Sequence, residues 1–317
     1  MIIKKRSAQI NFLGQAALKK RLDIGHIKFN EVENNYFRSK AGVSGEDFVD
    51  QQLARYEHPE THFIIHDLHL KASSFFQIDN LFVTQFYALI IEVKNIKHTV
   101  ELMQNPHYMK QTNPEGRVVI MDSPEEQLDK NIIWLRDWML RRNWFLPIEG
   151  VIVFTNSDSH IIPNNCSYDI VRPRYLTKKI RKMTVSKEVL SQEELMRLGE
   201  ELLLNHREYE HKALQVKYNL NSEDIITGVE CPVCYEIGMK WSKRKWVCSN
   251  NHSSKNAHFQ TLDDYFFIFG PEINNTEFRR FFHIKSKDVA KRMLKKMNLV
   301  EVGKGRWRRY RKLLSKS

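Results

Sequence analysis

The segment from residue 75 to residue 95 constrains this chain most, because it reads as two apolar strands that carry charged side chains. Its residues alternate with the two-residue period of a β-strand, and β-branched and aromatic residues are frequent among them. A turn at Gln85-Phe86 makes Asp79 face Glu92, with Lys94 two residues farther along the same face. Opposed carboxylates destabilise a strand pair, whereas a divalent cation between them converts repulsion into coordination. The alternative is a solvated ion pair of Lys94 at a strand end.

A helix is expected before this hairpin. Ser44-Gly45-Glu46-Asp47 offers a capping residue followed by two acids, and Val49, Leu53 and Tyr56 recur at helical spacing. Glu46 is then either an acid that stabilises the first turn of the helix or a residue of the site.

A second helix is expected after the hairpin, because Ser123 precedes Pro124 and two acids, the pattern of a capped helix start. Its apolar stripe consists of Leu128, Ile132, Leu135 and Met139. Gln127 lies one residue off this stripe, where it is either a surface amide or within reach of the polar edge of the sheet. Residues 148–155 read as a buried strand, so the sequence indicates an α/β domain with helices on both faces of its sheet.

The order of these motifs resembles that of the NERD (nuclease-related) domain family, part of the wider PD-(D/E)xK nuclease superfamily that includes restriction endonucleases and Holliday-junction resolvases. The motifs are Gly45-Glu46, Gln77-Ile78-Asp79, Ile91-Glu92-Val93-Lys94-Asn95, and Pro124 with Gln127. The resemblance covers residues 41–205 and implies a restriction-endonuclease-like mixed sheet flanked by helices. Asp79 lacks the preceding proline of the superfamily's name.

The resemblance also implies phosphodiester hydrolysis assisted by Mg²⁺ or Mn²⁺. Asp79, Glu92 and the backbone carbonyl of Val93 would ligate the ion, and such oxygen ligands suit a hard cation. Lys94 would orient or deprotonate the attacking water and neutralise charge in the transition state. Glu46 would hold a metal-bound water or a second ion, and Gln127 would orient the carboxylates or the substrate phosphate.

A second metal site is expected in the carboxyl-terminal half. Cys231-Pro-Val-Cys234, Cys248 and His252 have the spacing of a structural zinc site, with a hairpin over residues 240–247 between the two halves. The alternative is a set of free buried thiols. A ribbon of this size buries little apolar surface, and zinc would therefore act mainly as a structural clamp.

The fourth zinc ligand is the least certain feature of this spacing. His252 is the expected ligand and His258 is the alternative. Related zinc ribbons usually place a cysteine near Asn251, so this departure leaves open a weakened or lost site. Cys166 stands apart and is expected to be a packed thiol.

The last segment carries the excess positive charge of the chain. The net charge is +12, and residues 277–317 contain fifteen Lys or Arg against three acids, so the remainder is neutral. A short helix over 275–282, a helix capped by Ser286 and two strands around Gly303-Lys304-Gly305 follow the order of a winged helix-turn-helix. The expected nucleic-acid-binding residues on the second helix, which would enter a major groove, are Lys287, Lys291, Arg292 and Lys295. The expected phosphate contacts on the hairpin are Arg306, Arg308 and Arg309, with Trp307 and Tyr310. The alternative is a solvated basic face.

The expected segments are an N-terminal extension (1–40), a NERD nuclease-like domain (41–205), a helical linker (206–230), a zinc-ribbon-like knuckle (231–260) and a basic winged-helix-like module (271–317). Similar tails occur in some bacterial NERD proteins. No signal peptide or membrane span is evident, and the use of cysteine favours a cytoplasmic protein with no membrane partner.

Together these features predict a metal-dependent nuclease with nucleic acid as its partner. Duplex DNA is favoured, because the major groove of RNA helices is too narrow for a recognition helix. The alternatives are a DNA-binding regulator that keeps a nuclease-like fold without turnover, and an RNA-processing nuclease.

Overall fold

The computed structural model describes residues 1–7, 9–183, 187–208 and 212–312. The chain divides into two compact units. Unit 1 comprises Met1–Ala8 and Lys40–Tyr209, and unit 2 comprises Gln9–Ser39 and Glu210–Ser317. Residues 1–40, expected as one extension, are therefore shared between the two units.

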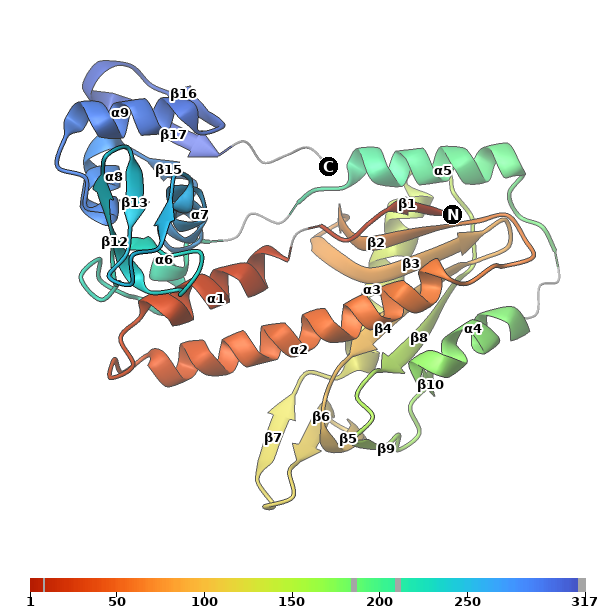
Figure 1. The fold of residues 1–317 in the computed structure, drawn as a ribbon. Helices are drawn as coiled ribbons and strands as arrows, with labels where there is room; N and C mark the ends of the chain where they lie inside the picture. The colour runs from red at the N-terminus through yellow and green to blue at the C-terminus, as the bar shows by residue number, and fades with distance from the viewer. Residues whose placement is uncertain (8, 184–186, 209–211, 313–317) are drawn as a thin grey trace. The chain divides into compact units, whose positions relative to one another are not determined.

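Unit 1 is built on a six-stranded mixed sheet with the strand order β1-β2-β3-β4-β8-β10 (Figure 1). The strands are β1 (Ile2–Lys4), β2 (His62–Lys71), β3 (Phe75–Thr84), β4 (Ala88–Lys94), β8 (Ile148–Phe154) and β10 (Asp169–Val171). Strands β2, β3 and β4 are antiparallel neighbours, whereas β1 pairs parallel with β2, and β8 pairs parallel with β4 and β10. This mixed α/β arrangement is consistent with a nuclease-like fold.

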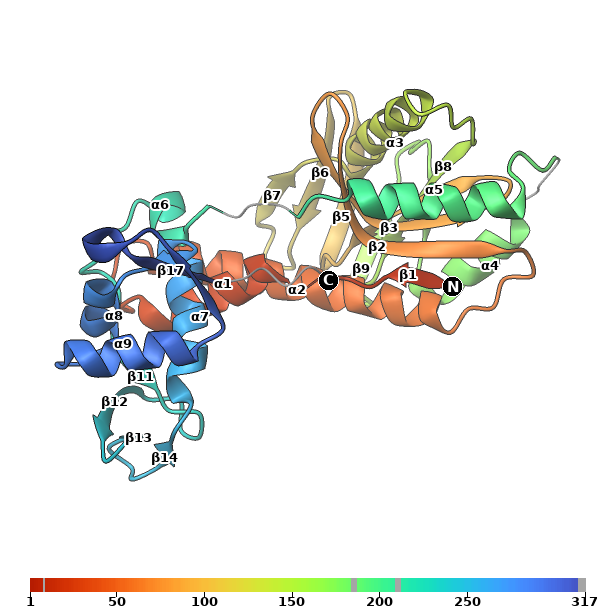
Figure 2. The ribbon, with the colours of Figure 1, turned by 90° about the horizontal axis from the view of Figure 1, so that it is seen from above.

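Helices cover both faces of this sheet (Figure 2). They are α2 (Phe29–Ala54) and α4 (Pro173–Lys182) on one face, and α3 (Pro124–Leu140) and α5 (Gln192–Asn205) on the other. Leu53 and Leu176 belong to the core under α2 and α4, and Leu128 and Leu198 belong to the core under α3 and α5. The strands are therefore buried on both sides, as their apolar sequences predict.

The expected hairpin is confirmed, including its register. Asn80 pairs with Ile91 and Val83 with Ala88, and the Thr84 amide donates to the Tyr87 carbonyl around the turn. The helix after the hairpin is also confirmed, with the Ser123 side chain accepting from the Glu125 amide. The buried strand expected over 148–155 is β8.

The expected start of the first helix at Ser44 is wrong. Helix α2 begins at Phe29 and runs without interruption to Ala54. The Ser44 hydroxyl donates to the Lys40 carbonyl one turn back, which is the other common hydrogen bond of serine in a helix. Glu46 therefore lies in the middle of α2, so a role in stabilising a first turn does not explain it.

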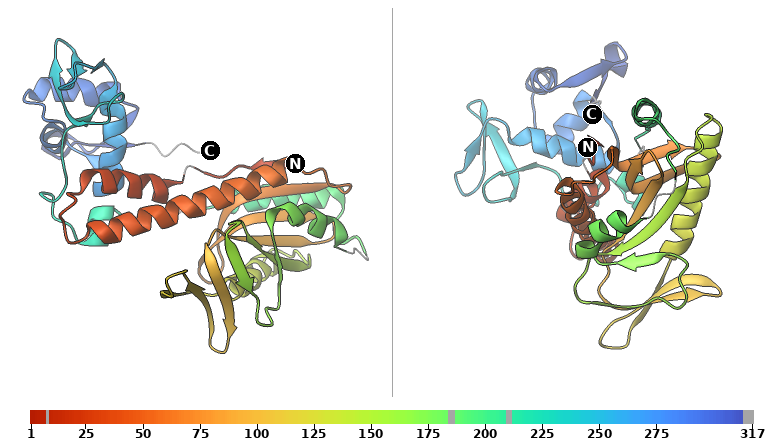
Figure 3. Two further views of the ribbon diagram at one scale, coloured as in Figure 1. Left: turned by 60° about the horizontal axis from the view of Figure 1, so that its bottom comes forward. Right: turned by 90° about the vertical axis from the view of Figure 1, so that its right-hand side faces the viewer.

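A smaller four-stranded sheet, order β7-β6-β5-β9, completes unit 1 and includes the yellow strands in Figure 3. Its strands are β5 (His98–Gln104), β6 (His107–Thr112), β7 (Val118–Met121) and β9 (Ser159–Ile162). Val100, Leu102 and Met109 join the core under α3, which fixes this sheet to the rest of the unit.

Unit 2 combines helices with two small sheets around one core. The helices wholly within it are α1 (Ile10–Arg21), α6 (Leu214–Tyr218), α7 (Ala257–Phe269), α8 (Asn275–Phe282) and α9 (Lys287–Lys296). One sheet contains β11 (Val229–Glu230), β12 (Ile237–Ser242), β13 (Lys245–Val247) and β14 (Ser253–Ser254); the other contains β15 (Glu272–Ile273), β17 (Arg309–Lys312) and β16 (Leu299–Val302). The hairpin expected over 240–247 and the Ser286 cap are both confirmed.

A buried ion pair fixes α1 within unit 2. Arg21 is fully buried, and its Nε donates to Asp264 Oδ2 of α7 at 2.9 Å. Lys20 pairs with the same carboxylate at 2.8 Å. Within the described part of the chain, no helix is long and apolar enough to cross a membrane.

Candidate active site and metal centre

Asp79, Glu92 and Lys94 come together where β3 and β4 leave their regular pairing. Asp79 and Glu92 occupy the position after the Asn80–Ile91 pair in the same register. At this position a side chain takes the place of a main-chain hydrogen bond between the two strands. Asp79 Oδ2 accepts a hydrogen bond from the Val93 amide at 3.0 Å. Lys94 Nζ donates to Glu92 Oε1 at 2.7 Å and to Gln127 Oε1 of α3 at 2.8 Å.

These charges are buried, which separates them from an ordinary surface ion pair. Asp79 is 8% exposed and Glu92 is 1% exposed. Burial and the nearby Asp79 carboxylate raise the pKa of Glu92 to about 7, and burial also raises the pKa of Asp79. Burial alone would lower the pKa of Lys94, but the Glu92 and Asp79 carboxylates together raise it, so the ammonium stays charged. The Lys94–Glu92 ion pair of the alternative interpretation therefore exists, but not in a solvated form.

Glu46 reaches the same site from α2, and Gly45 allows this approach. A Cβ at residue 45 would lie 2.7 Å from Thr155 Oγ1 and 2.8 Å from Asn95 Cβ, so any larger residue would push the helix away from the strand ends. Asn95 also donates to the Ala41 carbonyl of α2 at 2.7 Å. Burial and the Asp79 carboxylate raise the pKa of Glu46 to about 8.

Gln77, although part of the motif that contains Asp79, points to a different partner. Its Nε2 donates to Asp67 Oδ1 at 2.8 Å, and His69 Nε2 lies 2.8 Å from the same oxygen. Asp67 has a left-handed backbone, with φ of 53°. Burial would raise the pKa of Asp67, but the hydrogen bond and charge of His69 outweigh burial and lower this pKa to about 2.

Sequence reasoning missed Arg6, which contacts three parts of the site. Its guanidinium lies 3.1 Å from Glu46 Oε2, donates to both carboxylate oxygens of Asp50, and donates to the Asp79 carbonyl at 3.0 Å. Neither a motif nor a periodic pattern surrounds Arg6 in the sequence, so only tertiary structure reveals this contact.

The residues present fit a divalent cation. Glu92 Oε2 is buried without a hydrogen-bond partner, and an orphaned carboxylate oxygen is costly unless it is paired or bound to metal. Burial, with the Asp79 carboxylate as a second cause, raises the pKa of both Glu92 and Glu46, so neither carboxylate is fully compensated by its neighbours. Because carboxylates supply the available charge, a hard cation such as Mg²⁺ or Mn²⁺ suits the site better than a soft one.

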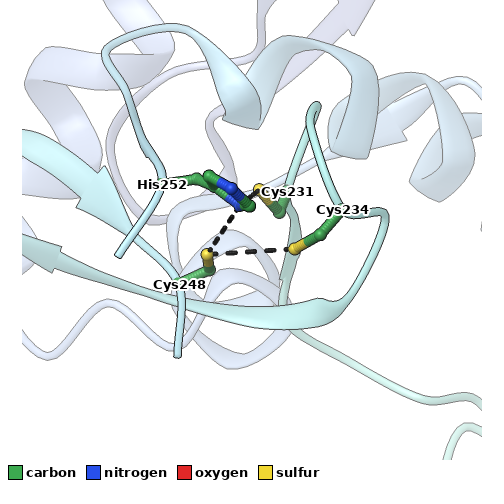
Figure 4. Close-up of side chains that lie close together, drawn as sticks. All are labelled: Cys231, Cys234, Cys248 and His252. Carbon is green, nitrogen blue, oxygen red and sulfur yellow. Dashed lines mark hydrogen bonds between the residues drawn. The ribbon is translucent and has the colours of Figure 1, made fainter. Parts of the chain in front are cut away.

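Cys231, Cys234, Cys248 and His252 form the second cluster, and their ligand atoms all lie within 4.8 Å of one another (Figure 4). Cys234 Sγ lies 3.9 Å from Cys248 Sγ, and His252 Nδ1 lies 3.7 Å from Cys231 Sγ and 3.5 Å from Cys248 Sγ. Ligands around a tetrahedral zinc ion are roughly 3.5–3.8 Å apart, whereas a disulfide needs about 2.05 Å. The cluster therefore fits a zinc knuckle.

His258, the alternative fourth ligand, has another role in the structure. Its Nδ1 accepts a hydrogen bond from the Trp246 indole at 3.1 Å, and burial lowers the pKa of His258 to about 4. Cys166 lies apart from the cluster as a half-buried free thiol of unit 1.

The expected nucleic-acid-binding residues divide into two groups. Lys287, Lys291, Arg292, Lys295 and Arg306 are exposed. Arg309 instead pairs with Glu272 and Glu277, and Arg308 lies 3.4 Å from Glu301. The first group is available to a ligand, whereas the second contributes to the structure of unit 2.

Helix α4 forms a further basic surface. The charges of residues 1–276 sum to zero, so the net charge of this part of the chain does not reveal it. Residues 172–182 contain six Lys or Arg and no acid. Arg174, Lys178, Arg181 and Lys182 are exposed, whereas Lys179 pairs with Asp169. A local count along the chain would have found this surface from the sequence.

A mixed sheet flanked by helices, with two carboxylates and a lysine at the end of a central hairpin, is consistent with a nuclease-like α/β fold. In agreement, residues 41–155 match the family model of the nuclease-related domain, NERD. Comparisons with curated proteins and with solved structures give no match. The family match includes β3, β4, α3 and β8, so it covers Glu46, Asp79, Glu92, Lys94 and Gln127 and indicates a nuclease-related function.

Glu92 should make the stability of unit 1 depend on pH and on divalent cations. An unfolded glutamate ionises near pH 4.5, whereas the folded pKa is about 7, so the folded state holds the extra proton between these values. Without divalent cation, stability should fall as pH rises from 4.5 to 7, by up to about 2–3 kcal/mol from this group. Added Mn²⁺ should restore it at pH 8.

Thermal unfolding of the full chain tests this expectation, in buffers without added divalent cation. Chelators are avoided because they would also remove zinc. Glu92→Gln should reduce the pH response, leaving the part that Glu46 and Asp79 contribute through their own raised pKa values, and should abolish the Mn²⁺ response, whereas the exposed control Glu149→Gln should keep both responses. Equal responses in Glu92→Gln and wild type would contradict this assignment.

Elemental analysis of the purified chain should give about one zinc per molecule. His252→Ala should lower this content, because it removes one of four ligands, whereas His258→Gln should leave it unchanged. The opposite result for the two histidines would identify His258 as the ligand.

Proposed function

We propose that this protein is a divalent-metal-dependent nuclease that hydrolyses phosphodiester bonds in DNA. One observation carries the proposal: Asp79, Glu92 and Lys94 meet at a buried strand end, where Glu92 Oε2 has no partner. A protein that only binds nucleic acid gains nothing from two buried carboxylates at one point, whereas a hydrolase needs them to hold its metal.

Asp79 and Glu92 would hold the ion, with the Val93 carbonyl as a further oxygen ligand. A bound Mg²⁺ or Mn²⁺ would supply Lewis-acid polarisation of the phosphate and a more acidic water. Asp79 is held in place through the Val93 amide, so its second oxygen stays available. Glu92 presents Oε2 in the same way, because Lys94 occupies Oε1.

Lys94 acts as a fixed positive charge in this proposal. Its raised pKa keeps the amine protonated at neutral pH, which favours stabilisation of transition-state charge over deprotonation of water. Gln127 fixes the direction of the ammonium by accepting one of its protons. Glu46, whose carboxylate interacts with that of Asp79, would hold a metal-bound water or a second ion.

Unit 2 would bind the nucleic acid. The order α7, β15, α8, α9, β16, β17 supports a winged-helix-like module, in which α9 would enter the major groove and the β16–β17 hairpin would contact the backbone. The exposed Lys and Arg side chains of α9 and the exposed Arg306–Trp307 pair at the hairpin support this role. Zinc would serve as a structural clamp on the knuckle.

The first test is cleavage of plasmid DNA, linear duplex DNA and structured RNA in the presence of Mg²⁺ or Mn²⁺. Asp79→Asn and Lys94→Ala should each lower the rate at least about 100-fold, because each removes charge that acts in the transition state. Lys97→Ala, which removes an exposed lysine three residues away, should retain full activity.

Cleavage of RNA alone would replace DNA as the substrate class. Salt-sensitive DNA binding without cleavage in any metal would favour a DNA-binding regulator on a nuclease-like fold.

Charge reversal on α9 tests the proposed nucleic-acid face. Truncation is unsuitable, because Phe278 and Phe282 of α8 lie in the core of unit 2. Lys291→Glu with Lys295→Glu should weaken DNA binding and lower the slope of log K against log salt by about 2, one for each lost phosphate contact. Lys240→Glu with Lys255→Glu, the same charge change at exposed positions of the knuckle region, should leave the slope unchanged.

A further inference from the structure

The N-terminal segment of unit 1 inserts a nearly buried guanidinium into the carboxylate cluster. The Arg6 side chain is 7% exposed. Its Nε and Nη2 donate to the two carboxylate oxygens of Asp50 at 2.9 and 3.0 Å, and its Nη1 lies 3.1 Å from Glu46 Oε2. This forked geometry is specific to arginine, because a lysine offers one point of charge.

The most informative contact of Arg6 is with the Asp79 carbonyl, at 3.0 Å. The sheet is irregular at this point. On β2, the set of residues that faces the core under α3 changes at Asp67. These residues have odd numbers before Asp67, such as Ile65, and even numbers after it, such as Leu68. On β3 the change runs the other way, from even-numbered residues before Asp79, such as Ile78, to odd-numbered residues after it, such as Leu81, while the β2–β3 register stays constant.

Two cations of the N-terminal segment hold this irregular position. Lys4 Nζ donates to the carbonyls of His66 and Asp67 at 3.0 and 2.9 Å, and Arg6 holds the carbonyl of Asp79 on the neighbouring strand. The left-handed backbone of Asp67 and the broken ladder at Asp79 leave main-chain oxygens that need donors. The N-terminal segment supplies those donors, and so determines where the Asp79 carboxylate points.

Arg6 also compensates the charge of the carboxylates. Burial would lower its pKa, but Asp50 and Glu46 together raise this pKa, so Arg6 remains charged. Burial would raise the pKa of Asp50, but hydrogen bonds from His66 and Arg6 lower it. Without Arg6, Glu46, Asp50 and Asp79 would lie close together with less compensating charge.

We propose that Arg6 is a positioning residue of the nuclease-like site. It fixes the Asp79 main chain, so that the Asp79 side chain is placed to accept the hydrogen bond from the Val93 amide. This inference rests on the proposed function for its catalytic consequence only, because the position of Asp79 can be measured without activity.

The test compares three variants of the full-length chain. Arg6→Gln removes the charge, and Arg6→Lys keeps the charge but loses the fork. Lys5→Gln is the matched control, because it removes the same charge from the exposed neighbouring side chain. Thermal unfolding midpoints identify any variant that fails to fold, in which case Arg6→Lys carries the test.

Two readouts are combined. The first is hydrogen exchange of the Val93 amide in ¹⁵N-valine-labelled protein, which reports its bond to Asp79. Arg6→Gln should accelerate this exchange at least about tenfold, and Lys5→Gln should not change it.

The second readout is steady-state cleavage, where Arg6→Gln should lower kcat at least about tenfold and leave KM for DNA unchanged, because Arg6 lies beneath the surface. Arg6→Lys should recover part of kcat.

Unchanged Val93 exchange in Arg6→Gln would overturn the proposal, as would equal losses in Lys5→Gln. A higher KM with unchanged kcat would also overturn it, because Arg6 would then act on substrate binding. A wild-type chain without metal-dependent cleavage would instead overturn the proposed nuclease function, and the Val93 readout would still decide whether Arg6 positions Asp79.

Discussion

The structure of unit 1 depends on keeping several carboxylates away from water at one end of a β-hairpin. Ionised groups in such a place need nearby positive charge or a metal. The chain supplies cations from two separate segments, Lys94 on β4 and Arg6 before α1. The neighbouring elements follow from this need: α3 brings Gln127 to Lys94, and Gly45 lets α2 approach closely enough to add Glu46. The site is therefore a balance of buried charges that several elements maintain together.

The same constraint explains which features were readable from the sequence. The hairpin register followed from alternation and a short turn, both of which are local, so the meeting of Asp79 and Glu92 could be predicted. The start of α2 could not be predicted, because a serine can either cap a helix or donate to the carbonyl four residues back. Ser44 forms the second bond, because α2 begins earlier and Ser44 lies inside it. Arg6 was invisible for a different reason, since its partner Asp79 lies 73 residues away and no pattern links them.

Positive charge in this protein serves two physical purposes that composition alone cannot separate. On α9 the basic side chains are exposed and available to a polyanion. Arg309 instead pairs with Glu277, which also forms the capping box at the start of α8, so this arginine helps to hold a helix in place. Sequence counts assign the same weight to both kinds of residue, and only the acids that face them in the structure distinguish a binding surface from a structural bridge.

The Cys231, Cys234, Cys248 and His252 cluster, which fits a zinc knuckle, is not a separate folding unit. Cys231 and Cys248 belong to the same hydrophobic core as Phe278 and Leu294, which support the helices α8 and α9. A thiolate that loses its metal or becomes oxidised would loosen this shared core and not merely one loop. The capacity of α9 to present its basic face would then follow the supply of zinc and the redox state of the surroundings. A metal with no contact to nucleic acid would in this way set how much of the protein is competent to bind it.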